Sequence, residues 1–431
     1  DRDAPDRLPL ALEYRHAAGY SLRQPSRTPV PTSWPWGPLT DNSLYDPAAI
    51  TRLPNTAYFD GIGLVVMRNG WGPDSTYITF KAGDNYWSHS HLDQGSFTIY
   101  KGGALAIDSG LYGPAYGADH HMNYTYQSIA HNLITVTDPA DTVPIPARKA
   151  NTEPRVIAND GGQRRVGSGW GVESAPLDIK EWRDKREIYH TATLIRQPGA
   201  EGITTLSADL TPAYTNRFSG QGTFADRTRR VEKYQRFFGY DRIDDVVVIL
   251  DRITATQTDF RKRWLLHTLE QPLITADGFV AETFPAAKPS RAGGRLEGHV
   301  LLPRKRVIQL VGGPGYEFLV DDKNYDDGVA AVMARRNNAE PGAWRVEILS
   351  DQANAQDEYL VVLLPTSLDR KSRHAIRFVE QGDEYGVEVT GPVRTTRWWF
   401  NSQREGARIE TARSAGTRTD HLTPSSPHEG G

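Results

Sequence analysis

The chain has 431 residues, a formal net charge of −3 and no cysteine. A net charge this small argues against bulk electrostatic binding of nucleic acid, and the lack of cysteine excludes disulfide bonds and thiolate metal ligands. No apolar run reaches about 18 residues, so no membrane-spanning helix is predicted. With 39 glycines, 28 prolines and only 3 methionines, the composition favours strands and turns over helices, in two or three domains.

The first 57 residues differ from the rest. Residues 8–16 are compatible with a short helix, and the five prolines between positions 25 and 38 exclude regular structure there. The chain begins with Asp1 and no signal-peptide core follows, so we expect a processed or truncated product. We therefore interpret residues 1–57 as a connector that follows a helical domain.

Strand signals become regular from residue 57 onward. The expected strands are 63–68, 76–80, 104–107, 132–136, 187–196, 203–210, 230–238, 244–253, 263–267, 300–302 and 307–311. Residues 246–250 are continuously apolar rather than alternating, which indicates a strand buried on both faces.

Shorter strands follow after residue 327. They are expected at 344–349, 359–364, 375–380, 385–389 and 395–400 and are interpreted as a final small sheet. The polar residues 412–431 predict a flexible tail. The fold class is therefore mainly β: a large antiparallel two-sheet β-sandwich over 58–328, followed by a smaller C-terminal β-sheet domain over 329–411.

Chemically reactive side chains are concentrated in one region, because five of the 12 histidines lie between His89 and His131. In an extended strand His89, His91 and Asp93 share one face. A turn at 101–103 then folds the chain back toward them. A bend at or just before Gly95 is needed to bring Asp108 level with His91.

Two interpretations of this region follow from the residues themselves. Two histidines and an aspartate drawn from separate strands can hold a divalent cation, and nitrogen and carboxylate ligands without thiolate suit zinc. The other interpretation is that these are polar residues that cap a hairpin and hydrogen-bond one another.

Proton transfer is a further possibility. A histidine with a near-neutral pKa can take a proton from carbon if the resulting charge is stabilised. Tyr112, Tyr116, Tyr124 and Tyr126 lie nearby in the sequence as acid or base partners. Each is equally compatible with an aromatic lid or a sugar-stacking surface.

Residues 87–139 resemble the C-terminal half of the heparinase II/III-like polysaccharide lyases. The segments that carry this resemblance, by their order and spacing, are 89–97, 106–113 and 129–132. Within the family the run is most similar to heparinase II. Residues 263–267 fit a strand of the same β-region, and a weaker resemblance extends over 57–400.

The resemblance implies a central β-sandwich, a smaller C-terminal sheet and cleavage of uronate-containing polysaccharides by β-elimination. It implies that His91, Asp108 and His131 bind a mainly structural zinc ion and that His89 faces the substrate. His89 is then the candidate base or carboxylate neutraliser, assisted by Tyr112, Tyr116 or Tyr124. The zinc can also keep an open position for water or substrate, as catalytic zinc does.

The sequence departs from the family in one large respect, because nothing in it matches the N-terminal (α/α) toroid. Family members draw a tyrosine and charge-neutralising residues from that domain. We expect either a separate chain that carries the toroid or a fragment of a longer enzyme. The expected setting is the periplasm or the exterior of a bacterium.

Three basic clusters are hypothetical contacts for sulfate or carboxylate groups, although solvated strand edges are the more ordinary interpretation. They comprise Arg227, Arg229, Arg230 and Lys233, then Arg261, Lys262 and Arg263, and finally Arg304, Lys305 and Arg306. The sequence does not choose among heparan sulfate, other glycosaminoglycans and alginate-like polyuronates. The alternatives to a lyase are a non-catalytic carbohydrate-binding β-sandwich and a zinc-dependent hydrolase.

Overall fold

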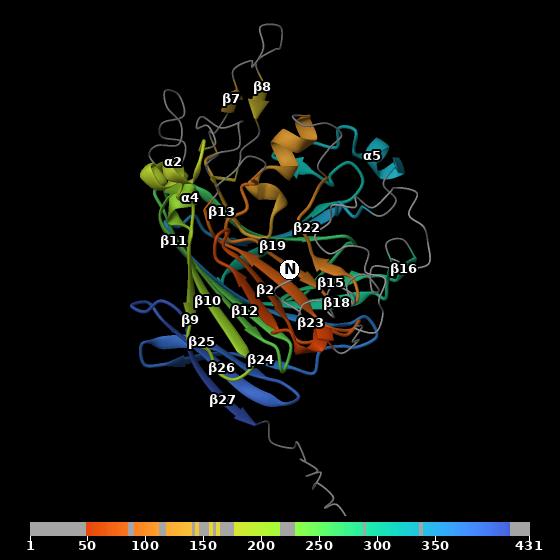
Figure 1. The fold of residues 1–431 in the computed structure, drawn as a ribbon, viewed down its shortest axis with the longest axis vertical. Helices are drawn as coiled ribbons and strands as arrows, with labels where there is room; N and C mark the ends of the chain where they lie inside the picture. The colour runs from red at the N-terminus through yellow and green to blue at the C-terminus, as the bar shows by residue number, and fades with distance from the viewer. Residues whose placement is uncertain are drawn as a thin grey trace, which may run out of the picture.

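The computed structural model describes residues 49–84, 90–111, 118–139, 143–145, 155–157, 161–163, 176–215, 229–287, 290–335 and 339–413. Strands in antiparallel sheets hold 49% of the described residues and helices 10%, which confirms the predicted mainly-β fold (Figure 1). The N-terminal residues 1–48 and the tail from residue 414 lie outside this description, so the helix expected at 8–16 does as well.

Three sheets form the central part. A five-stranded sheet runs in chain order through β1 (Thr56–Phe59), β2 (Leu64–Arg68), β3 (Tyr77–Lys81), β4 (Phe97–Tyr100) and β5 (Ala104–Ala106). An eight-stranded sheet has the order β14 (Leu273–Ile274), β15 (Gly278–Thr283), β18 (Gly294–Leu302), β23 (Gln356–Ser367), β12 (Val246–Ala255), β11 (Val231–Asp241), β10 (Ile203–Asp209) and β9 (Thr193–Gln197). A four-stranded sheet has the order β19 (Arg306–Gly312), β22 (Trp344–Ser350), β13 (Arg261–Thr268) and β6 (Ile134–Thr137).

The C-terminal sheet is a four-stranded meander, shown in blue in Figure 1. It comprises β24 (Ala375–Gln381), β25 (Glu384–Thr390), β26 (Arg394–Asn401) and β27 (Arg408–Arg413). Three two-stranded ribbons pair β7 (Val143–Ile145) with β8 (Arg155–Ile157), β16 (Ala286–Ala287) with β17 (Ser290–Arg291), and β20 (Leu319–Val320) with β21 (Lys323–Asn324). The helical segments are η2 (Ala49–Arg52), η3 (His121–Thr125), η4 (Ser128–Ala130), α2 (Ile179–Asp184), α3 (Arg186–Tyr189), α4 (Thr211–Thr215) and α5 (Val329–Arg335).

The eight-stranded sheet is the middle layer, and β12 shows why. Val247 and Ile249 belong to the main core, which this sheet shares with the five- and four-stranded sheets. Val246 and Val248 point the other way, into a second core beneath the C-terminal sheet. Neighbouring strand residues face opposite sides, so a layer covered twice must be apolar at every position. The prediction that residues 246–250 are buried on both faces is confirmed.

The same rule corrects one expectation. Residues 344–349 and 359–364, expected in the final small sheet, lie in β22 and β23, which pair with β13 and β12. Residues 360–364 are a second continuously apolar and fully buried run, which is the signature of the middle layer. The C-terminal sheet as observed therefore comprises only residues 375–413, and the proposed domain limits stay a prediction.

One expected strand begins later than predicted. The first three residues of the segment expected at 187–196 lie in the short helix α3, and β9 starts only at Thr193. The preceding helix α2 is capped by Asp178, whose side chain accepts a hydrogen bond from the Glu181 amide at 2.8 Å. Pairing with β10 extends only from Thr193 to Gln197, so residues before it have no strand partner there.

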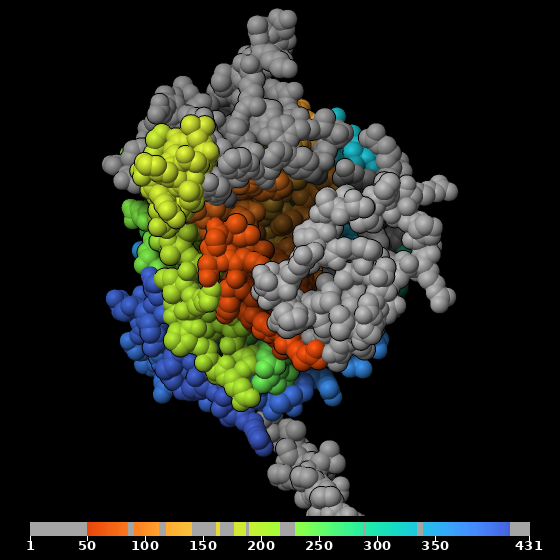
Figure 2. Space-filling view, in the orientation of Figure 1, coloured from red at the N-terminus to blue at the C-terminus, as the bar shows by residue number. Residues whose placement is uncertain are grey.

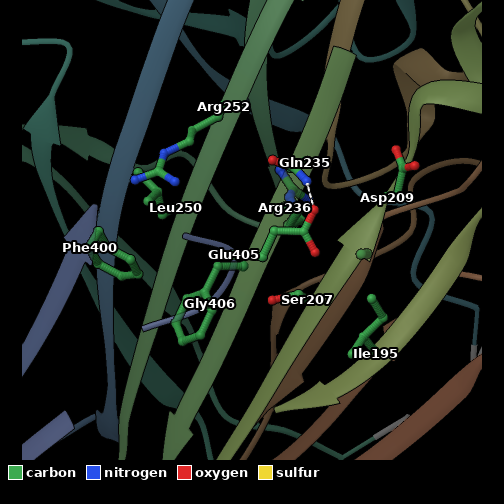
Figure 3. Close-up of a pocket in the computed structure, with 12 residues that line it drawn as sticks. Ile195, Ser207, Asp209, Gln235, Arg236, Leu250, Arg252, Phe400, Glu405 and Gly406 are labelled. Atoms are coloured by element: carbon green, nitrogen blue, oxygen red, sulfur yellow. Dashed lines mark hydrogen bonds between the residues drawn. The ribbon is translucent and has the colours of Figure 1, made fainter. Parts of the chain in front are cut away.

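A polar joint fixes the C-terminal sheet to the middle layer. The Arg394 guanidinium donates two hydrogen bonds to Asp241, from Nε at 2.9 Å and from Nη2 at 2.6 Å. A small crevice, shown in Figure 3, lies farther along β11, where Gln235 donates to Glu405 and Arg252 approaches from β12. Arg252 itself pairs with Glu358 at 3.0 Å, so polar groups that line the crevice already have partners within the protein.

A buried ion pair between β11 and β12 connects the middle layer to the segments that contain Gly95 and Asn132. The Arg236 guanidinium donates to both carboxylate oxygens of Asp251, at 2.6 and 2.8 Å, and neither side chain is exposed. Its remaining nitrogen, Nη1, donates to the carbonyl oxygens of Gly95 at 2.5 Å and Asn132 at 3.1 Å. Burial alone would lower the pKa of Arg236, but Asp251 raises it above its usual value.

A smaller core covers the outer face of the four-stranded sheet, with His120 among its aromatic residues. The His120 Nε2 atom accepts a hydrogen bond from the Leu111 amide at 3.1 Å, so Nδ1 carries the proton and donates to the Tyr325 carbonyl at 2.5 Å. Its ring lies 4.7 Å from that of Phe318 and 5.7 Å from that of Tyr124. Burial lowers the pKa of His120, which keeps the ring neutral.

We expect Asp251→Asn to lower the free energy of unfolding by about 3–5 kcal/mol, because Arg236 is left buried without its counter-charge. Urea denaturation followed by tryptophan fluorescence measures this change. Arg304→Met is the matched control, since the pair of Arg304 with Glu380 is exposed on both sides. An Asp251→Asn midpoint as close to wild type as that of the control would contradict the assigned role.

His120 should make the fold sensitive to mild acid. Its pKa in the folded chain lies below the unfolded value of about 6.5, so its contribution to stability is complete above that pH and is lost as the pH falls through 6 toward 5. We expect His120→Gln to reduce the stability difference between pH 7 and pH 5, because glutamine does not titrate in this range. Urea midpoints of both proteins at the two pH values test this, and an unchanged difference would refute it.

Candidate active site

The histidine segment is a turn rather than a strand. Residues 91–96 precede β4, which begins only at Phe97. The Ser96 amide donates to the Asp93 carbonyl at 3.0 Å, and Gly95 has a φ of +86°. A side chain at Gly95 would be strained by that backbone and would also meet Leu210 at 2.5 Å. The shared strand face expected for His91 and Asp93 is wrong, whereas the bend expected at Gly95 is confirmed.

Of the three expected metal ligands, His131 contacts Asp108, and the His91 ring lies beside that of His131. The Nδ1 atom of His131 lies 3.1 Å from Oδ1 of Asp108, and the ring centres of His91 and His131 are 5.4 Å apart. His131 is buried, with 1% of its side chain exposed, whereas 51% of the Asp108 side chain is exposed. The cluster therefore has a closed side at His131 and an open side at Asp108.

The surroundings shift the pKa values of the two rings in opposite directions. Burial and the neighbouring His131 together lower the pKa of His91 to about 4, so His91 is neutral at physiological pH. Burial also acts to lower the pKa of His131, but Asp108 and then Asp93 outweigh it and raise that pKa. A neutral imidazole and a carboxylate are the forms in which these residues bind metals.

Asp93 is held by a lysine. Burial raises the pKa of its carboxyl group, but Lys81 more than offsets this, and the pKa is lowered overall. The Lys81 Nζ atom donates to Asp93 Oδ1 at 2.6 Å. Asp93 thus supports the turn by hydrogen bonding and is committed to Lys81.

The residues fit zinc in chemistry but only partly in arrangement. Two zinc ligands in a tetrahedral site lie about 3.3 Å apart, close to the 3.1 Å between His131 and Asp108. The other ring nitrogen of His131, Nε2, is buried without a hydrogen-bond partner. Within the described ranges, however, no three His, Cys, Asp or Glu side chains are placed closely enough to hold a metal ion.

Asn132 is the main structural link of the site. Its Nδ2 atom donates to the carbonyls of Phe97 at 2.7 Å and Ile107 at 2.9 Å. Its Oδ1 atom accepts from the amide of His267 at 2.8 Å. One buried amide therefore fastens β4, the segment before Asp108 and β13 to the residue that follows His131. The sequence motif at 129–132 contains Asn132, but only the pairing of distant strands reveals this role.

The predicted catalytic residues divide into two groups. Tyr124 is wholly buried, and its hydroxyl donates to Ser109 Oγ at 2.9 Å. Burial raises the pKa of Tyr124, so the hydroxyl stays protonated and stabilises the segment around Asp108. His89, Tyr112 and Tyr116 lie outside the described residues.

Several residues of the basic clusters have partners within the protein. Lys262 lies 3.1 Å from Asp357, Arg263 lies 3.8 Å from Glu347, and Arg304 lies 2.9 Å from Glu380. Arg230 lies 3.5 Å from Asp138, and Arg227 falls outside the described residues. These basic residues therefore form ion pairs within the protein rather than offering a free charge to a ligand.

Among the described residues, no helix is both long enough and apolar enough to span a bilayer.

Known proteins were compared with this chain. A heparin-sulfate lyase of Bacteroides stercoris is 34% identical over 81 residues, which are 18% of this chain and 12% of that protein. A solved heparinase III, the BT4657 gene product, has a TM-score of 0.47 and 15% identity, and a heparan sulfate lyase HepC from Pedobacter heparinus has 0.48 and 12%. Each of these two alignments covers 84% of this chain and 43% of the other, so the chain spans less than half the length of these relatives.

A family model described as "Heparinase II/III-like, C-terminal" matches residues 51–415. This range includes all four sheets and the cluster of His91, Asp108 and His131. The chain belongs to the heparinase II/III-like family.

Proposed function

We propose that this chain is the β-sandwich part of a polysaccharide lyase that cleaves uronate-containing polysaccharides by β-elimination. The observation that carries the proposal is the cluster of His91, Asp108 and His131, of which His91 lies two residues after His89 in the chain. Membership of the heparinase II/III-like family supports the same reaction class.

The reaction requires removal of the proton at C5 of a uronic acid, next to the carboxylate. That proton is weakly acidic, so the developing negative charge needs a nearby positive or hydrogen-bonding group. We assign His89 as the base or as the group that neutralises the carboxylate. Tyr112 or Tyr116 assists as the acid that protonates the leaving oxygen, and Tyr124 supports the fold of the site.

The described residues hold both ends of the segment that carries His89. On one side Asp84 accepts hydrogen bonds from His190 Nδ1 at 2.7 Å and from the Thr191 amide at 3.1 Å. The two ends are linked because the Gly83 amide donates to Gln94 Oε1 at 2.8 Å. The fixed residues around this segment support the proposal that His89 has a catalytic or binding role, which requires precise positioning.

We further propose that His91, Asp108 and His131 hold a zinc ion with a mainly structural role. The exposed Asp108, the neutral His91 and the 3.1 Å between His131 Nδ1 and Asp108 Oδ1 support this assignment. Zinc would supply a further cross-link between three segments that hydrogen bonds such as Ser109 N–Ala130 O and Leu92 N–Tyr126 O already join. His91, the first described histidine after His89, would then be fixed relative to β5 and η4.

The substrate class follows from the family rather than from the cluster. The relatives reported above are named as heparin-sulfate and heparan sulfate lyases, so heparan sulfate is the first substrate to test, before other glycosaminoglycans and alginate-like polyuronates. We infer that a helical toroid, on a separate chain or on a longer form of this one, completes the cleft. Such polymers occur outside the cytoplasm, and we place the protein in the periplasm or outside a bacterial cell.

We expect His89→Ala to reduce the rate of elimination by about 10²–10⁴-fold, because the proton-transferring group is lost. The unsaturated uronate product absorbs in the ultraviolet, so a continuous absorbance assay on heparan sulfate measures the rate. His374→Ala is the matched control, since His374 bonds Ser372 and the Asp244 carbonyl beside the C-terminal sheet.

Two outcomes would replace the lyase assignment. New reducing ends without ultraviolet absorbance would identify a hydrolase, and retention of the polysaccharide without cleavage would identify a carbohydrate-binding module. Equal activity of His89→Ala and wild type would remove His89 from the mechanism.

We expect the purified protein to hold about one zinc ion per chain and Asp108→Asn to hold far less. Elemental analysis gives the stoichiometry, and removal of the metal with a chelator should lower the thermal midpoint until zinc is restored. Asp119→Asn is the control, because Asp119 lies near Lys323 at 3.8 Å and not in the cluster. A wild-type protein without stoichiometric metal would refute the site.

A further inference from the structure

The five-stranded sheet has one face in the core and one face outside it. Its inward residues are fully or almost fully buried: Val65, Met67, Ile78, Phe80, Phe97 and Ile99. Its outward residues alternate with them and retain partial exposure: Leu64, Val66, Arg68, Tyr77, Thr79, Lys81, Thr98 and Tyr100. Most of these outward residues are polar or aromatic. A strand face that packs into a protein core would instead be aliphatic.

One end of this outward face carries a stacked group of an arginine and aromatic rings. The Arg68 guanidinium carbon lies 3.8 Å from the centre of the Trp71 ring and 4.9 Å from that of Tyr77. Tyr100 is the cross-strand neighbour of Tyr77 and is 40% exposed. Trp71 is fixed in turn, because its Nε1 atom donates to the Leu53 carbonyl at 3.2 Å.

The charge of Arg68 is not used within the described part of the chain, where no carboxylate forms an ion pair with it. Burial lowers the pKa of Arg68, with Tyr77 acting against this, yet a guanidinium stays charged at neutral pH. The nearby Lys101, in contrast, is committed to Asp245 at 2.8 Å. Arg68 is thus a planar cation, held by two rings, with hydrogen-bonding capacity left for a ligand.

The outward face connects this group to the candidate active site. Lys81 lies on the same strand and face as Tyr77, about 13 Å away at ~3.3 Å per residue. The hydroxyls of Thr79 and Thr98 lie between these ends, 2.6 Å apart. Lys81 in turn holds Asp93 in the turn that follows His91. In Figure 2 the red-orange strands reach the surface at the centre of the face shown, and the orange-brown segments that follow them lie deeper beside them.

We propose that Arg68, Trp71, Tyr77 and Tyr100 form a binding site for an acidic sugar unit of the polysaccharide, away from the bond that is cleaved. The guanidinium pairs with a carboxylate or sulfate through two parallel hydrogen bonds, and the exposed Tyr100 ring contacts the apolar face of a sugar. The proposal rests on the function proposed above. It adds a second anchoring point, which places the chain along the outward face of the sheet.

Affinity electrophoresis of the full chain in gels that contain heparan sulfate, alginate or neutral dextran tests the site. Wild type should be retarded by the anionic polymers and not by dextran. Arg68→Gln should weaken that binding by about tenfold, because a charged bidentate contact is lost. Tyr100→Ala should weaken it several-fold, and Tyr100→Phe should restore it, since the ring rather than the hydroxyl makes the contact.

Arg304→Gln is the matched control, because Arg304 also lies over an aromatic ring, 4.6 Å from that of Phe378, but is paired with Glu380. Urea midpoints confirm that the variants are folded, and Arg68→Lys replaces Arg68→Gln if the latter does not fold, with the same loss of bidentate geometry. Wild-type retardation that Arg68 and Tyr100 variants leave unchanged would overturn this site but not the proposed function. No retardation of wild type by any uronate polymer would overturn both.

Discussion

The ion pair of Arg236 and Asp251 is the constraint on which the upper part of the molecule depends. It is wholly buried, and its cost in desolvation is offset only while every donor of the guanidinium has an acceptor. Two of those acceptors are the carbonyls of Gly95 and Asn132, which belong to irregular segments outside the middle layer. The rigid sheet thereby dictates the position of the turn after His91 and of the residue after His131.

The candidate site is accordingly assembled from segments that have little regular structure of their own. The turn at 91–96, the residues around Asp108 and the short helical segments before His131 meet above the sheet. Asn132 and the buried Tyr124 hydroxyl supply additional bonds between them. Residues with perturbed pKa values cluster here because burial and close charges coincide, a combination that is frequent at functional sites.

Much of the fold could be predicted from apolar patterns, because strand periodicity and burial are local properties of the sequence. The run at 246–250 revealed a strand covered on both sides, and the run at 360–364 carried the same signal but was placed in the wrong sheet. The positions of His91, Asp108 and His131 were predictable in part, since a glycine bend and a hairpin limit the return path of the chain. The carbonyl partners of Arg236 and the partners of Asn132 were not, because they are more than 20 residues away and no local pattern specifies them.

The double coverage of β12 and β23 has a consequence for how the protein can be divided. Removing residues 375–413 would uncover one entire apolar side of the middle layer, including Val248 and Val362. A contiguous apolar surface of that kind promotes self-association in water. The C-terminal sheet therefore cannot be removed, by evolution or by limited proteolysis, without exposing this apolar surface. A recombined gene that lacks the sheet would have to encode another domain that packs against the same surface.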